Sequence, residues 1–164
     1  MSEKADTPKR HQRDKLLIAA VTGAVAVLVA VALSIGYAVS VMGGYHRYIQ
    51  DLGDSLLYAR TNDTLEITVD NETSPAYIDD AEWLYKRIER AGMGSPLSEL
   101  PEGESFAFSF GDGSTLQLFP TTIDEPDGTQ AEGAIVCYTR SDGHKFSYDT
   151  DLLVYERIEE HCAS

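Results

Sequence analysis

The most extended pattern in the chain is an uninterrupted apolar run that covers residues 16–42. No Asp, Glu, Lys or Arg occurs between Lys15 and Arg47. A helix over this run would extend for about 40 Å at about 1.5 Å per residue, which exceeds the ~30 Å hydrocarbon thickness of a bilayer. The run therefore predicts one transmembrane helix at residues 16–42, with the lipid bilayer as its surroundings.

The segment that follows this run, residues 43–62, has the pattern of an amphipathic helix. Its apolar positions recur at intervals of three and four residues: Tyr45, Tyr48, Ile49, Leu52, Leu56 and Leu57. We expect a juxtamembrane helix or stalk here. Tyr45 and Tyr48 would lie at the membrane interface, where an aromatic side chain has both an apolar and an aqueous neighbour.

Residues 63–164 begin with a strand and a helix. Apolar and polar residues alternate over residues 64–69, which predicts a strand. Ser74 and Pro75 have the order of a helix cap and a first helical residue, and an apolar stripe predicts a helix over residues 75–91. Trp83 lies outside this stripe. It either widens the buried face of the helix or is an exposed contact residue.

The C-terminal half of the chain has the pattern of an antiparallel sheet. We expect strands at residues 106–110, 115–119, 134–140 and 145–148, joined as two hairpins by turns that contain Asp and Gly. Residues 120–133 are predicted to form a long acidic loop, and residues 150–160 a last helix. The fold class is α+β: an N-terminal transmembrane helix, then a small domain whose antiparallel sheet of two hairpins packs against helices.

This pattern of strands, helix and Asp-Gly turns resembles small uncharacterised extracytoplasmic α+β domains of Gram-positive bacterial membrane proteins and lipoproteins. The resemblance covers residues 64–160 and depends on core positions and turns, above all residues 65–69, 78–88, 106–119 and 135–148. It implies a bacterial origin and a domain outside the cytoplasm. It implies no functional residues.

Charge indicates the orientation of the predicted span. The chain has 13 basic and 27 acidic side chains, and five of the basic and three of the acidic ones precede residue 16. Lys and Arg beside a span stay in the cytoplasm, so we expect residues 1–15 to be a cytoplasmic head and residues 63–164 an extracytoplasmic domain. The alternative is a secretory signal that is cleaved near Ser40, but the apolar run is longer than such signals require.

Two features of the sequence suggest covalent or helix–helix contacts. Cys137 and Cys162 both lie in the polar domain, where an oxidising exterior would allow them to form a disulfide; two free thiols are the alternative. Small residues recur every four positions in the apolar run, and such a stripe would let two helices approach as a homodimer: Thr22, Ala26, Ala30, Ser34 and Ala38. The run is rich in small residues throughout, so several such stripes can be drawn.

No motif in the polar domain predicts catalysis, a cofactor or a metal. The Gly-x-Ser-x-Gly elbow of hydrolases and the Cys-x-x-Cys spacing of zinc sites are absent, and Pro126 interrupts an EF-type loop that would begin at Asp124. The acidic surface excludes nucleic acid as a partner.

We therefore expect a non-enzymatic binding domain for a protein or cell-envelope ligand, with the loop 120–133 and the exposed side of the sheet as candidate surfaces. The alternatives are an envelope hydrolase with unidentified carboxylates and a structural dimeric membrane protein.

Overall fold

The computed structural model describes residues 7–124 and 127–162, with side chains from Val21 onward. The chain forms two compact units, residues 1–42 and residues 43–164. Helix α1 (Thr7–Asn62) contributes residues to both units. Part of the predicted head is therefore helical, while its residues 1–6 lie outside the described residues.

The first unit is the apolar N-terminal part of α1. The side chains of residues 21–40 are all exposed. The most apolar stretch has a mean hydropathy of 2.4, and none of it is buried. By length and composition this helix could cross a membrane, as an anchor or as a signal sequence.

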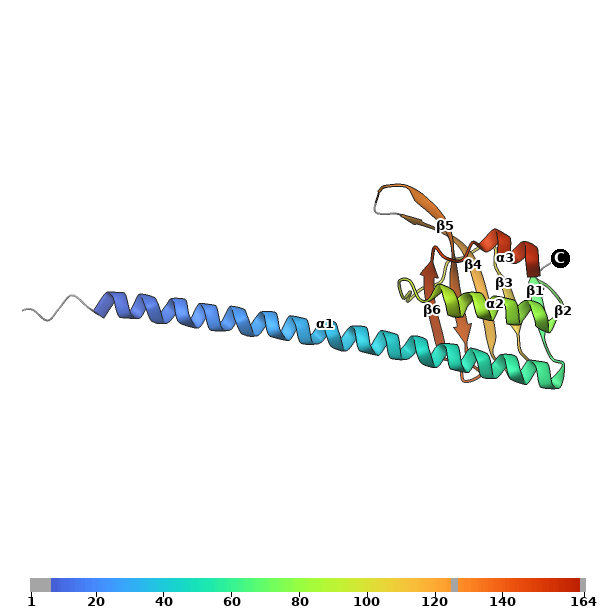
Figure 1. Ribbon diagram of the computed structural model, residues 1–164, viewed down its shortest axis with the longest axis horizontal. Coiled ribbons are helices and arrows are strands. Elements are labelled where there is room, and N and C mark those ends of the chain that lie inside the picture. The colour runs from blue at the N-terminus through green and yellow to red at the C-terminus, as the bar shows by residue number, and fades with distance from the viewer. Residues whose placement is uncertain (1–6, 125–126, 163–164) are drawn as a thin grey trace, which may run out of the picture. The chain divides into compact units, whose positions relative to one another are not determined.

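The second unit contains one antiparallel sheet in the order β2-β1-β3-β4-β5-β6 (Figure 1). The strands are β1 (Glu66–Val69), β2 (Glu72–Pro75), β3 (Phe106–Ser109), β4 (Thr115–Asp124), β5 (Gln130–Thr139) and β6 (Lys145–Thr150). The other helices are α2 (Ile78–Ala91) and α3 (Tyr155–Cys162). The predicted α+β class is confirmed, although the sheet has two more strands than the two predicted hairpins supply.

One face of the sheet forms the main core. Phe106, Phe108 and Phe110 point to this face because successive strand residues alternate between the two sides. Leu84 and Ile88 of α2 pack on the same cluster, as do Tyr155 and Ile158 of α3. Each fully buried side chain of this kind stabilises the fold by about 1.5–3 kcal/mol.

Residues 43–62 are the first helix of this domain, and the prediction of a stalk is wrong. The side chains of Tyr48, Leu52, Leu56 and Ala59 are buried in the main core. Tyr48 stacks on Phe146 of β6 with ring centroids 5.1 Å apart. The predicted amphipathic stripe is present, and its apolar side covers the sheet. Its assignment was wrong at Leu57, whose side chain is exposed.

This packing also contradicts the predicted interface role of Tyr48, while that of Tyr45 stays a prediction. Tyr48 is buried by the sheet, so its ring does not face lipid. Tyr45 is partly buried and packs edge-on against Tyr148, with ring centroids 5.9 Å apart. An aromatic residue one turn from an apolar span resembles an interface anchor in sequence, and only the position of β6 distinguishes the two cases.

The start of α2 differs from the prediction because Ser74 and Pro75 belong to β2. Asp70 and Asn71 both adopt positive φ, which turns β1 directly back into β2. The helix begins at Ile78, and its cap residue Tyr77 makes no side-chain capping bond. The last helix also begins later than predicted, at Tyr155.

The predicted acidic loop at residues 120–133 is largely strand. β4 and β5 pair continuously from Thr115↔Thr139 to Asp124↔Gln130. β3 pairs with only residues 115–118 of β4, and β6 pairs with only residues 134–139 of β5. The outer part is therefore a two-stranded ribbon, which projects beyond the sheet (Figure 1).

The second face of the sheet carries a smaller cluster. Phe119, Ile135 and Cys137 are buried there, and Leu97 and Leu100 of the connection between α2 and β3 pack against them. The same connection runs along β6, where the Leu97 N–H donates to the Ser147 carbonyl at 2.9 Å. The edge of the sheet at β6 is thus occupied by the chain itself.

Candidate functional site

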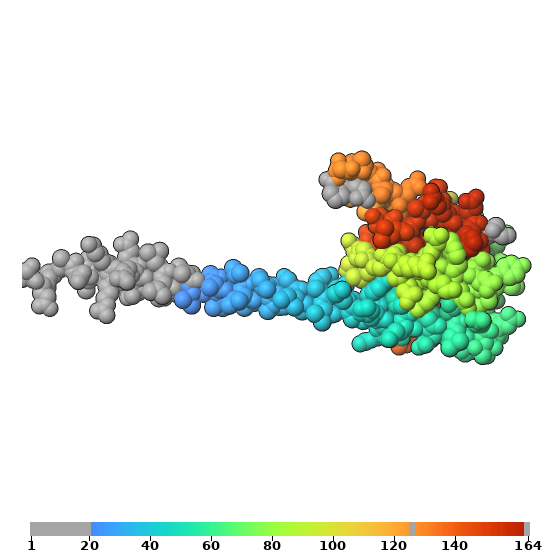
Figure 2. All heavy atoms as spheres, viewed as in Figure 1, coloured from blue at the N-terminus to red at the C-terminus, as the bar shows by residue number. Residues whose placement is uncertain are grey.

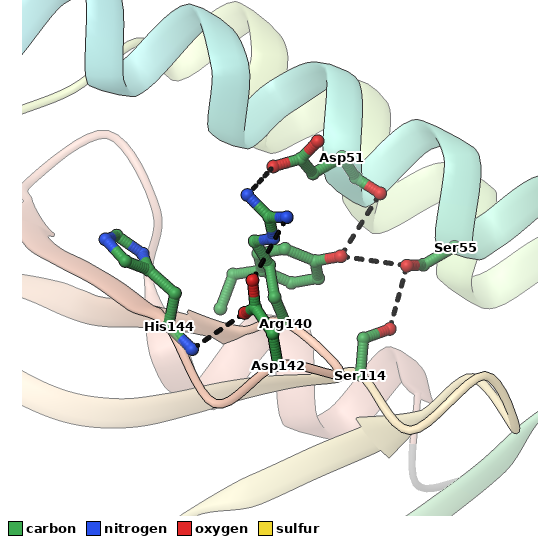
Figure 3. A network of polar contacts seen from close by, with 7 residues as sticks. Asp51, Ser55, Ser114, Arg140, Asp142 and His144 are labelled. Atoms are coloured by element: carbon green, nitrogen blue, oxygen red, sulfur yellow. Dashed lines mark hydrogen bonds and ion pairs between the residues drawn. The ribbon is translucent and has the colours of Figure 1, made fainter.

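A polar network joins α1 to the turns of the sheet (Figure 3). The Ser55 hydroxyl lies 2.8 Å from the Tyr138 hydroxyl and donates to an Asp112 carboxylate oxygen at 2.7 Å. The Ser114 hydroxyl donates to the Ser55 oxygen at 2.8 Å. Ser55 and Ser114 are both buried. Four side chains from three segments therefore satisfy one another inside the fold.

A second arm of the network extends this contact to the surface. The Tyr138 hydroxyl donates to the Asp51 carbonyl at 3.1 Å. The Arg140 guanidinium lies 3.5 Å from the Asp51 carboxylate and 3.2 Å from the Asp142 carboxylate. His144 contributes its backbone N–H, which donates to Asp142 at 3.0 Å. These bonds fix α1 on the ends of β5 and β6.

The chemistry of the network is that of a structural clamp. Among the described residues, the hydroxyls of Ser55 and Ser114 have other hydroxyls and the Asp112 carboxylate as side-chain partners. The arrangement therefore differs from a serine–histidine pair. Partial burial raises the pKa of the Asp112 carboxyl, but hydrogen bonds from Ser114, Ser55 and backbone N–H groups outweigh this and lower it. The carboxylate is thus held ionised as an acceptor.

A groove of about 630 Å³ runs along the exposed side of α2 and is the leading candidate for a binding site. It is lined by Asp79, Glu82, Trp83, Lys86, Arg87, Arg90, Ala91, Leu152 and Leu153. The lining residues from α2 are three or four positions apart, so they share one face of the helix. Leu152, from the segment before α3, is 64% exposed.

The centre of the groove is organised around Trp83. The Arg87 guanidinium lies 4.3 Å from the centre of the Trp83 ring, in a cation–π contact. The imidazole of His161 stacks on the same indole with ring centroids 4.1 Å apart. His161 also lies 3.7 Å from the Asp80 carboxylate. These contacts connect α2 to α3 and fix the position of the Arg87 guanidinium.

A second groove, of about 560 Å³, lies beside the β1–β2 hairpin and the start of α2. It is lined by Ile67, Pro75 and Cys162, and by the acidic residues Asp70, Glu72 and Asp80. Its described lining residues include no Lys, Arg or Trp, so it lacks the fixed indole and the cations of the groove along α2. It is the weaker candidate for a binding site.

The predicted disulfide is absent, since Cys137 and Cys162 are free thiols. Cys137 belongs to the smaller cluster on one face of the sheet, and Cys162 to the main core on the other. The sheet separates the two sulfur atoms, and a disulfide requires Cα atoms no more than about 7 Å apart. Strand alternation, which places Cys137 opposite Tyr138, decides this.

Both thiols are protected from reaction. Burial raises the pKa of the Cys137 thiol. Burial, together with the Asp80 carboxylate, raises the pKa of the Cys162 thiol to about 12. The reactive species is the thiolate, which is scarce at neutral pH for both residues.

We expect the folded full chain in detergent to react negligibly with an aromatic disulfide reagent at neutral pH. In denaturant without reductant it should release two equivalents of chromophore, because both thiols become accessible. The control is the same protein reduced before denaturation, which should give an identical result. Two equivalents only after reduction would show that the cysteines are bonded.

The remaining predicted residues do not form a site in the described part of the chain. The small-residue stripe from Thr22 to Ala38 lies on exposed α1, where the Ser34 hydroxyl donates to the Ala30 carbonyl at 2.9 Å. The helix dimer stays a prediction. No group of three or more metal-ligating side chains occurs among the described residues. Asp124, at which the interrupted EF-type loop would begin, accepts a hydrogen bond from the Gln130 side chain at 3.0 Å.

Sequence reasoning did not recognise the groove, although one signal was available. Trp83 and Arg87 are four residues apart, which places them side by side on a helix. Leu152 is close to them only through the position of α3, and no local pattern shows this.

Comparisons with known proteins give no further guidance: no family model, curated protein or solved structure matches the chain.

Proposed function

We propose that this protein is a single-pass membrane protein that presents residues 43–164 outside the cytoplasm as a binding domain for a protein ligand. The observation that carries the proposal is the exposed apolar helix, none of whose most apolar stretch is buried. Exposing this helix to water costs free energy, and insertion into a bilayer removes that cost. Five basic residues precede the apolar run, all before residue 16, which favours a cytoplasmic N-terminus.

The proposal of binding rather than catalysis depends on the two polar regions of the domain. The buried Ser55–Ser114–Asp112 contacts are satisfied internally, as a structural clamp requires. The groove along α2 instead brings together an indole, cations and an exposed aliphatic side chain. Trp and Arg are the residue types that most often dominate the energy of protein–protein contacts.

Fusions after Ser164 in a bacterial host test the orientation. Alkaline phosphatase, which folds only outside the cytoplasm, should be active when it is fused there, and green fluorescent protein should be dark. A control chain in which Lys9, Arg10, Arg13 and Lys15 are changed to Glu should lose part of this asymmetry. If the native chain gave an inactive phosphatase fusion and a fluorescent green fluorescent protein fusion, the proposed orientation would be contradicted.

The mass of the protein in the membrane fraction tests retention of the helix. We expect the full chain of 164 residues, because the apolar run is longer than a signal peptide core. A soluble product that begins near residue 41 would show cleavage instead. It would retain the whole compact unit of residues 43–164, so the binding domain would be secreted rather than anchored.

A further inference from the structure

We propose that the groove along α2 binds a short acidic segment of a partner protein, whose carboxylates contact Lys86, Arg87 and Arg90 and whose apolar side chain packs on Leu152. This inference rests on the proposed function and specifies the ligand of that domain. In Figure 2, α2 (yellow-green) and α3 (red) lie side by side on the visible face of the domain.

The first support is the concentration of positive charge. Residues 16–164 contain eight basic and 24 acidic side chains, and three of the eight basic ones line this single groove. Among the described residues, no carboxylate lies within 4.0 Å of the charged nitrogens of Lys86, Arg87 or Arg90. Arg60 and Arg140, by contrast, are paired. The groove cations are therefore available to a ligand.

The second support is preorganisation. Arg87 lies on the Trp83 ring, so its guanidinium is held in place before a ligand arrives. A fixed guanidinium loses less side-chain entropy when it forms a two-pronged bond to a carboxylate. His161 supports the indole by stacking on it and connects it to α3. The site is thus built by two elements rather than by a flexible surface chain.

The third support is the apolar surface next to the charges. Leu152 is 64% exposed and lines the same groove. Transfer of an apolar side chain onto it would add affinity in proportion to the apolar area that is buried. A ligand that combines carboxylates with an apolar residue satisfies both parts of the groove, whereas a free inorganic anion satisfies only one.

The groove also has a direction. Asp79 and Glu82 line it toward the start of α2, and Arg90 lines it toward the end. The Glu82 carboxylate is partly neutralised by Arg60 at 2.8 Å. A bound segment should therefore place its acidic residues near Arg90 and its uncharged or basic residues near Asp79.

Charge complementarity favours a protein segment over a membrane or a nucleic acid. The domain as a whole is strongly acidic and would be repelled by an anionic bilayer or by phosphate chains. The carboxylates of Asp79 and Glu82 add a local repulsion at one end of the groove. A short segment can avoid these groups, but an extended anionic surface cannot.

The full chain in detergent micelles provides a direct assay, because Trp83 is its single tryptophan. Degenerate pools of short synthetic peptides serve as probes: one of acidic and apolar residues, one of basic and apolar residues, and one of acidic residues with serine. We expect the first pool alone to change the Trp83 emission saturably, at roughly 10–100 μM, and to lose affinity as salt is raised. No saturable change below about 1 mM would overturn the proposal.

Variants locate the binding, and their affinities are measured by the anisotropy of a labelled peptide from the acidic and apolar pool. Arg87→Glu and Lys86→Glu should each weaken binding by roughly tenfold or more, because a favourable charge becomes a repulsive one. Leu152→Ser should weaken it by roughly threefold to tenfold through lost apolar contact. Arg157→Glu is the matched control, since Arg157 is exposed on α3 and does not line the groove. Equal losses in Arg157→Glu and Arg87→Glu would overturn the assignment.

Two further measurements distinguish other occupants. Vesicles of phosphatidylglycerol that bind the protein more tightly than the peptide pool does, in a manner lost in Arg87→Glu, would show a lipid site and overturn the proposal. Self-association in sedimentation that is lost in Arg87→Glu would show that a second copy occupies the groove, and would also overturn it. If the fusions showed a cytoplasmic domain while the acidic and apolar peptides still bound, the proposed location would be wrong. The assignment of the groove would still hold.

Discussion

Leu52→Ala should lower the free energy of unfolding of the polar domain by about 3 kcal/mol, the usual cost of truncating a fully buried leucine. Leu52 is 1% exposed and lies in the main core against the sheet. The expected result follows from the assignment of residues 43–62 to the domain. Urea unfolding of the full chain in detergent, followed by Trp83 emission, measures the change.

Leu57→Ala is the matched control, since it makes the same substitution on the same helix at a side chain that is 62% exposed. It should change the free energy of unfolding by less than about 0.5 kcal/mol. A chain shortened to residues 63–164 should fail to unfold cooperatively, because it lacks the Tyr48, Leu52 and Leu56 side chains that cover the sheet. A cooperative transition of the shortened chain, or equal losses in the two leucine variants, would show that residues 43–62 are a stalk after all.

Gly111→Ala should cost about 2–4 kcal/mol of stability, through a strained backbone and a steric overlap. Gly111 has a φ of +76°, in the left-handed region that residues with a Cβ rarely adopt. A Cβ built at this position would overlap the Thr64 side chain. Thr64 cannot move freely, because its hydroxyl donates to the Phe110 carbonyl at 2.9 Å. Thermal unfolding of the full chain measures the loss.

Gly143→Ala separates the two contributions to this loss. Gly143 has a similar φ of +84°, but a Cβ there would have nothing within 4 Å. We expect a loss of about 1 kcal/mol from the backbone alone. The difference between the two alanine variants is the cost of the contact with Thr64. Equal losses would indicate that the turn at Gly111 rearranges and that the contact is not rigid.

The sheet was predictable where its signals were local. Phe106 and Phe108 alternate with small residues, and this alternation by itself assigns them to one buried face. The turns around Asp112 and Asp142 are short enough to determine hairpin pairing. Both inferences depend on residues within a few positions of one another, and the structure confirms them.

The predictions were wrong where one sequence pattern is compatible with two kinds of secondary structure. Ser74-Pro75 satisfies the rules for a helix start, but it is equally acceptable in an edge strand whose outer side needs no hydrogen bonds. Residues 120–133 contain enough acidic and turn-forming residues to suggest a loop, yet continuous pairing with a neighbour makes most of them strand. In both cases the partner strand decides, and it is not encoded locally.

The candidate groove depended even more on distant contacts. Trp83 was recognised as outside the apolar stripe, which left its role open between burial and contact. The stacking of His161 and the approach of Leu152 place it in a groove. Leu152 and His161 lie 69 and 78 positions after Trp83, so no short window of sequence contains the site.

The sequence by itself determined the apolar helix, the acidic character of the domain and the buried face of the central strands, because hydrophobicity, charge and strand alternation are properties of consecutive residues. Only the tertiary structure decided that residues 43–62 belong to the core, that the two cysteines lie on opposite faces of the sheet, and that the cations of α2 share a groove with Leu152. Each of these depends on which segments meet across the sheet, and that is set by the packing of the whole domain.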